Sequence, residues 1–118
     1  MLSYLAPDQI ITEDISRYYE DKAEVHILRL DKISPDISGN KWFKLRYYID
    51  EAKAMRKKGI LTFGRAWSNH IVATAAACGN AGLQSIGIIR GEEPSLSSFT
   101  LSHARDFGMQ LVFISRAA

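Results

Sequence analysis

The sequence is poor in cysteine, in long apolar runs and in net charge, and each shortage excludes a class of protein. Cys78 is the one cysteine among 118 residues, so neither an internal disulfide nor a zinc site built from several cysteines can form. The most apolar stretch, "IVATAAAC" at 71–78, is far too short to cross a bilayer. The opening "MLSYLAPDQI" lacks the basic region and apolar run of a signal peptide. We therefore expect a cytoplasmic protein.

The charge balance gives no reason to expect a nucleic-acid or membrane partner. Fifteen Lys and Arg residues face 13 Asp and Glu residues, for a net charge of +2. With 47% hydrophobic and 24% charged residues, the composition is that of an ordinary globular protein. The length suffices for one domain with a real core.

Apolar periodicity and turn residues divide the chain into alternating strands and helices. Residues 1–24 are turn-prone and predict an N-terminal arm with a helical turn at most, and 25–118 predict an α/β domain. The expected elements are strands at 24–31, 60–63, 84–90 and 109–115, with helices at about 39–58, 69–80 and 97–107. A strand followed by three helix–strand units predicts a parallel sheet with flanking helices.

The first long helix carries one apolar stripe. Trp42, Leu45, Ile49 and Ala52 recur at three- and four-residue steps, which predicts a buried face. Gly59 is expected to end this helix. In a parallel sheet, ligands lie beyond the carboxyl ends of the strands. Two segments of this sequence are candidates for such positions: the one leading into Lys41 and the loop 64–69 after the strand at 60–63.

Two lysines occupy the first turn of the expected helix at 39–58. The unpaired N–H groups of a helix start carry about half a positive charge, so Lys41 and Lys44 are unfavourable there unless they point into water. They are three residues apart and share a face. An anionic ligand such as a phosphate would relieve the conflict. A carbonyl compound would relieve it differently, by forming a Schiff base with one amine.

Ser68, Asn69 and His70 form the second candidate cluster, at a strand-to-helix turn. The plain interpretation is an N-cap that satisfies backbone N–H groups. The alternative is a polar pocket for a carboxylate and a hydroxyl. The sequence lacks a nucleophile elbow, a dinucleotide fingerprint and a P-loop. His26 and His103 have no second ligand at metal spacing, so no metal site is expected.

Three segments in this order resemble the family of 1-aminocyclopropane-1-carboxylate deaminases and D-cysteine desulfhydrases. They are "SGNKWFKL" at 38–45, "FGRAWSNHIVATAAACGNAGL" at 63–83 and "SIGIIRGEEP" at 85–94. Members of that family are pyridoxal-phosphate enzymes of the tryptophan synthase β-type fold. The resemblance implies pyridoxal 5'-phosphate as cofactor, a small amino acid as substrate, and release of ammonia and a 2-oxo acid.

The resemblance also assigns roles to the two clusters. It implies that Lys41 is the catalytic Schiff-base lysine and that Lys44 helps to hold the cofactor phosphate. It implies that Asn69 binds the ring hydroxyl of the cofactor and, with Ser68 and His70, the substrate. Ser68 would hold the substrate carboxylate or assist proton transfer.

The sequence departs from the family in two ways. Family members have two domains, so this chain corresponds by resemblance to the N-terminal arm and most of the smaller domain. Arg65 stands where the family usually has a second glycine. If that position needs a positive φ, a non-glycine residue costs about 1 kcal/mol or more. A bulky cation there could also crowd the cofactor.

Two functions remain open at this stage. The first is a deaminase or lyase that acts on 1-aminocyclopropane-1-carboxylate or D-cysteine, in a homodimer as is the habit of the family. The second is a non-catalytic α/β unit that serves as a dimerisation or anion-binding module. Apolar surface left exposed would favour self-association.

Overall fold

The computed structural model describes residues 10–20, 22–34, 37 and 40–117. Its elements alternate between strand and helix along the chain. In chain order they are β1 (Thr12–Asp14), the 3₁₀ helix η2 (Ser16–Tyr19), β2 (His26–Leu28), the 3₁₀ helix η3 (Leu30–Lys32), α1 (Lys41–Ala54), β3 (Gly59–Gly64), α2 (Asn69–Ala81), β4 (Gln84–Arg90), α3 (Phe99–Asp106) and β5 (Gln110–Ile114).

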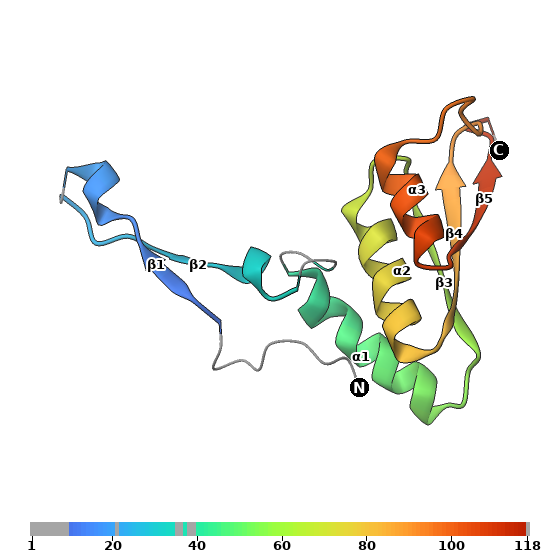
Figure 1. Ribbon diagram of the computed structural model, residues 1–118, viewed down its shortest axis with the longest axis horizontal. Coiled ribbons are helices and arrows are strands. Elements are labelled where there is room, and N and C mark those ends of the chain that lie inside the picture. The colour runs from blue at the N-terminus through green and yellow to red at the C-terminus, as the bar shows by residue number, and fades with distance from the viewer. Residues whose placement is uncertain (1–9, 21, 35–36, 38–39, 118) are drawn as a thin grey trace.

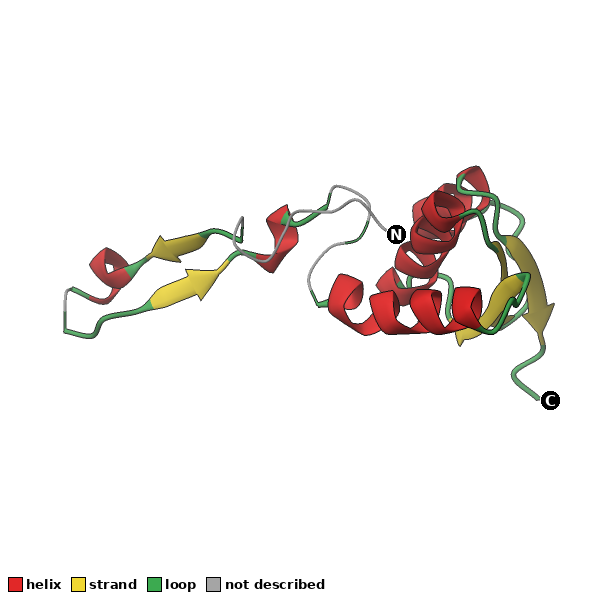
Figure 2. Cartoon of the chain, turned by 90° about the horizontal axis from the view of Figure 1, so that it is seen from below, coloured by secondary structure: helices red, strands yellow, loops and turns green. Residues whose placement is uncertain are grey.

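The body of the molecule is a parallel three-stranded sheet with helices packed beside it. The strands lie in the order β3-β4-β5, with Gly59 opposite Gln84 and Ile86 opposite Gln110. Helices α2 and α3 pack against each other and cover one face of the sheet, and α1 packs on α2 (Figures 1 and 2). This arrangement confirms the α/β class predicted from the alternation of elements.

The stripe predicted on α1 is the face that the helix buries. Its buried residues are Trp42, Leu45, Ile49 and Ala52. Trp42, Leu45 and Ile49 belong to a core cluster that also holds small residues of α2, including Ala73, Ala76, Ala77 and Cys78. Small side chains allow the two helices to approach closely, and Cys78 serves there as a small buried apolar residue.

The prediction that Gly59 ends α1 was wrong. The helix ends at Ala54, and Arg56 adopts the left-handed conformation with φ of 55°. The N–H of Lys57 donates to the carbonyl of Ala52 at 2.8 Å, which is the bond pattern of a Schellman turn. Gly59 instead begins β3, where an added Cβ would lie 2.6 Å from the carbonyl oxygen of Gln84. The glycine is required by the close approach of β4.

The end of α2 is as expected. Gly82 has a φ of 71°, and the N–H of Leu83 donates to the carbonyl of Cys78 at 2.9 Å. Glycine adopts this left-handed conformation without the penalty that a Cβ brings. The chain therefore turns directly from α2 into β4.

The strand expected at 24–31 forms, but it does not belong to the parallel sheet. Its residues 26–28 pair antiparallel with β1, a strand that was not predicted within the arm. All three residues of β2 are exposed, so no apolar face draws this strand to the main sheet. The pair is held by Arg29, whose N–H donates to the carbonyl of Ile11 at 2.8 Å and whose guanidinium lies 2.6 Å from the carboxylate of Glu13. The two-stranded unit thus spans the boundary expected between 24 and 25, and the division into arm and domain stays a prediction.

The other face of the parallel sheet carries exposed apolar side chains. On β3, Leu61 and Phe63 point away from α2, and on β5 the same holds for Val112 and Ile114. Among the described residues, no helix combines the length and the apolarity needed to cross a membrane.

Candidate functional site

Helices α1 and α2 both begin without a side-chain cap. Asn40 precedes α1 and Ser68 precedes α2, and neither side chain accepts a bond from the N–H groups of its helix. Neither first turn contains an acidic residue. Ser98 before α3 shows the contrast, because its Oγ accepts from the N–H of Leu101 at 3.1 Å. The starts of α1 and α2 thus keep a partial positive charge that neither cap side chain offsets.

Lys41 and Lys44 lie on the uncapped first turn of α1. Lys41 is half-buried and Lys44 is exposed. Neither ammonium group forms an ion pair with any residue that the structure describes. Within the described ranges, two cations without an acidic partner therefore lie at the positive end of the helix.

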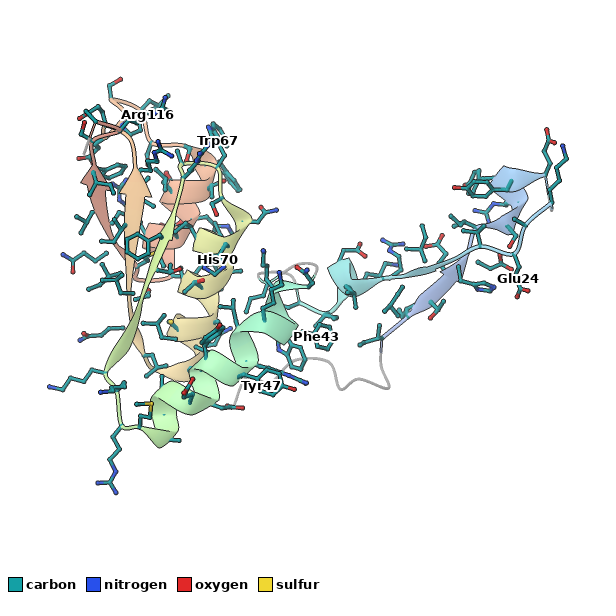
Figure 3. The ribbon with its side chains drawn as sticks, turned by 180° about the vertical axis from the view of Figure 1, so that it is seen from behind. Glu24, Phe43, Tyr47, Trp67, His70 and Arg116 are labelled. Carbon is teal, nitrogen blue, oxygen red and sulfur yellow. The ribbon has the colours of Figure 1, made fainter. Side chains whose placement is uncertain are left out.

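His70, in the first turn of α2, faces these lysines. Its Nε2 lies 2.7 Å from Oγ1 of Thr62 on β3. Burial lowers the pKa of His70 below its ordinary value of 6.5, and the charges of Lys41 and Lys44 lower it further. The packing of α1 on α2 therefore places Lys41 and Lys44 near enough to His70 for their charges to act on its ring. Figure 3 shows where His70 lies on α2.

Ser68 and Asn69 sit where the chain turns from β3 into α2. The N–H of Ser68 donates to the carbonyl of Arg65 at 3.1 Å, which closes the turn. An added Cβ on Gly64 would lie 3.3 Å from Oγ of Ser68 and 2.7 Å from Cδ1 of Ile71, so only glycine lets the strand pass this close. The side chain of Asn69 is exposed. The N-cap interpretation of this cluster is wrong for the hydroxyl of Ser68, which caps nothing.

The backbone strain considered at Arg65 is absent. Among the described non-glycine residues, only Glu20 and Arg56 have a positive φ. Arg65 is exposed at the end of β3, so its charged group has room to extend. Arg65 therefore does not adopt the left-handed conformation, and its backbone carries no strain of that kind.

Two threonines at the site were not predicted. Thr62 is a polar residue on the helix-facing side of β3, and Thr74 is fully buried in α2 with its Oγ1 at 3.5 Å from Nε2 of His70. A sequence signal existed for Thr62, because a hydroxyl at an inward position of the strand "ILTF" needs a partner. The identity of that partner depends on how α2 packs on the strand.

The site suits an anion better than a metal ion. Two helix starts carry partial positive charge, and two amines add full charge to one of them. No group of three His, Cys, Asp or Glu side chains within the described ranges could hold a metal. The donor set fits a phosphate together with a group that can react with an amine.

Comparison with known proteins places these features in a family context. No protein-family model matches the chain. A protein of Pyrococcus horikoshii named "Putative 1-aminocyclopropane-1-carboxylate deaminase" is 35% identical over 88 residues, which are 75% of this chain and 26% of that protein. The nocardicin C-9' epimerase of Nocardia uniformis is 34% identical over 70 residues, 59% of this chain and 21% of the enzyme.

A solved structure agrees with these relatives. The crystal structure of an ACC deaminase homologue superposes with a TM-score of 0.74 and 29% identity, over 89% of this chain and 32% of that one. The family resemblance and the fold predicted from the sequence are thereby confirmed. The chain spans about a quarter of the length of the curated relatives it matches. These relatives carry names of different reactions, so the shared region does not by itself define one reaction.

Proposed function

Because the chain is a relative of proteins named 1-aminocyclopropane-1-carboxylate deaminases, we propose that it carries the lysine-bearing part of a pyridoxal 5'-phosphate site. The whole protein would be a deaminase or lyase that acts on a small amino acid and releases ammonia and a 2-oxo acid. The observation that supports this proposal is the pair Lys41 and Lys44 on an uncapped helix start, with no neutralising carboxylate in the described part of the chain.

The two lysines would have different tasks in this site. Lys44 is exposed one turn into α1 and would attract the phosphate, together with the N–H groups of the helix start. Lys41 is half-buried and would be the covalent attachment point of the cofactor. When bound, pyridoxal phosphate supplies an electron sink for a carbanion of the amino acid.

The start of α2 would bind the substrate and the cofactor ring. Asn69 would donate to the ring hydroxyl, and the uncapped hydroxyl of Ser68 would bind the substrate carboxylate or move a proton beside it. His70 would remain neutral near neutral pH, since burial and the two lysines lower its pKa. A neutral imidazole does not compete with the lysines for an anion, so His70 would position the first turn of α2 and leave the positive charge to α1.

The substrate is proposed as 1-aminocyclopropane-1-carboxylate or D-cysteine. The name of the Pyrococcus relative favours the first.

A trapping experiment tests the cofactor site directly. The pure chain is incubated with pyridoxal phosphate, reduced with borohydride and mapped by mass spectrometry, beside Lys41→Ala and the control Lys53→Ala. Selective labelling of Lys41, unchanged in the control, supports the proposal. Equal labelling of many surface lysines contradicts it.

The open sheet face favours a second candidate, a non-catalytic unit that self-associates as a homodimer. Phe63 is 67% exposed and Leu61 is 54% exposed on the edge strand β3. Neighbouring apolar side chains of this size usually mark a protein contact. Sedimentation of the chain and of Phe63→Lys tests this candidate, which predicts dimers for the first and monomers for the second. Monomers for both would exclude it.

A further inference from the structure

Three arginines gather at one end of the parallel sheet. Arg65 directly follows β3, Arg90 is the last residue of β4, and Arg116 comes two residues after β5. Together with Ala66 and Trp67 they line a cavity of about 440 Å³. Figure 3 shows Trp67 and Arg116 at this end of the molecule, away from His70.

The arginines of this cavity have no acidic partner among the residues that the structure describes. Two other described arginines do have one, since Arg29 pairs with Glu13 and Arg105 pairs with Glu93. Three like charges around one cavity repel each other, and an anion inside the cavity would relieve that repulsion. The positive charge of the cavity is therefore typical of an anion-binding site. The described residues form none of the ion pairs that would give these arginines a purely structural role.

The cavity is built on a rigid frame. The N–H of Gly91 donates to the carbonyl of Ile114 at 2.7 Å, so the ends of β4 and β5 are joined. Nε of Arg116 lies 3.7 Å from the position that a Cβ on Gly91 would occupy. Ser98 Oγ donates to the carbonyl of Ala66 at 2.6 Å, which ties the loop after β3 to the start of α3.

We propose that this cavity binds a phosphorylated small molecule that carries a planar ring. A guanidinium fork can bind a single carboxylate with two parallel bonds, whereas a phosphate group has enough oxygens for several arginines. Trp67 is 74% exposed and offers a ring face for stacking. The volume lies within the range of small-molecule sites. The proposal rests on residues other than Lys41 and Lys44 and does not depend on the proposed function.

One carboxylate lies close enough to oppose an anion. Glu92 lines an adjoining cavity of about 550 Å³ that shares Ala66, Arg90 and Arg116. It forms no ion pair among the described residues. The negative charge of Glu92 should weaken phosphate binding. Removing that charge should therefore increase the affinity, whereas removing an arginine should decrease it.

Fluorescence of Trp67 gives a direct binding assay, because Trp42 is buried elsewhere. The full chain is titrated with adenosine 5'-monophosphate, with pyridoxine 5'-phosphate, which lacks the aldehyde and cannot react with lysine, and with inorganic phosphate and adenosine alone. Trp67→Phe shows which part of the signal comes from that ring. The two phosphorylated ligands should saturate and bind more tightly than phosphate or adenosine, and the tighter of them identifies the ring that fits.

Variants with opposite effects complete the test. Arg90→Gln and Arg116→Gln should each weaken binding about tenfold. Glu92→Gln should strengthen it about twofold to fivefold. Lys57→Gln, an exposed cation away from the cavity, should change nothing. Absence of saturable binding, equal binding of adenosine alone, or an equal loss in Lys57→Gln would overturn the proposal.

Discussion

Nε2 of His70 lies 2.7 Å from Oγ1 of Thr62, and this contact joins the first turn of α2 to the inner side of β3. The hydroxyl of Thr74, one turn along α2, approaches the same nitrogen at 3.5 Å. The imidazole is therefore held between strand and helix by hydroxyl groups, which carry no charge. This environment, together with the lysines of α1, favours the neutral ring.

Removing the hydroxyl of Thr62 should weaken the fold. Thr62→Val keeps the shape of the side chain but leaves Nε2 of His70 without its closest partner, at a cost of about 1–3 kcal/mol in the free energy of unfolding. Urea unfolding measures this loss. Thr62→Ser retains the hydroxyl and should lose less than half as much; an equal loss would mean that the methyl group, and not the hydrogen bond, matters.

Stability should fall on mild acidification because of His70. Burial, and then the charges of Lys41 and Lys44, hold its pKa below 6.5. The unfolded chain binds a proton near pH 6.5 and the folded protein does not. The free energy of unfolding is therefore greatest above pH 6.5 and decreases as the pH falls from 6.5 through the lower folded pKa.

Unfolding in urea at about pH 7.5 and about pH 5 tests this dependence on His70. His70→Gln should remove the part of the slope that His70 causes. In Lys41→Ala/Lys44→Ala the NMR titration of the His70 ring should move to higher pH. A ring that titrates at the same pH in both proteins would contradict the proximity of the lysines. Asp14 and Asp31 have pKa values lowered from 3.8, so they act only in more acidic solution.

The two serines that precede helices should respond differently to alanine. Ser98 accepts from the N–H of Leu101 and donates to Ala66, so Ser98→Ala should cost about 1–2 kcal/mol of stability. Ser68 makes no cap bond, so Ser68→Ala should stay within about 0.5 kcal/mol. Chemical denaturation of both variants gives the comparison. A large loss in Ser68→Ala would show that its hydroxyl has a structural task.

Cys78 should be inert in the folded protein. It is fully buried in α2, and burial raises the pKa of its thiol to about 11. Because the thiolate is the reactive form, an aromatic disulfide reagent should modify Cys78 only as fast as the chain unfolds. Rates measured with and without urea check this expectation. Fast modification of the native protein would mean that the packing of α1 on α2 opens locally.

The parts of the fold that could be predicted are those set by nearest neighbours along the chain. The buried stripe of α1 follows from the spacing of Trp42, Leu45 and Ile49, and the end of α2 follows from a glycine that adopts positive φ. The end of α1 could not be predicted in this way. Arg56 takes the left-handed position there, and Gly59 is needed instead because β4 leaves no space for a Cβ.

The candidate site, too, could be predicted only where local sequence is sufficient. Lys41 and Lys44 are recognisable from the sequence because they conflict with the helix start on which they lie. The partnership of His70 with Thr62, and the meeting of Arg65, Arg90 and Arg116, arise only when strands far apart in the sequence are placed side by side. Local patterns carry no information about such meetings.

The strand order of the main sheet has a consequence for synthesis on the ribosome. Because β3, β4 and β5 are neighbours in space in the order in which they are translated, each new strand adds to an edge that already exists. No strand has to insert between two others. A nascent chain can pair β4 with β3 as soon as Arg90 has left the exit tunnel, and α3 and β5 then dock on a sheet that is already started.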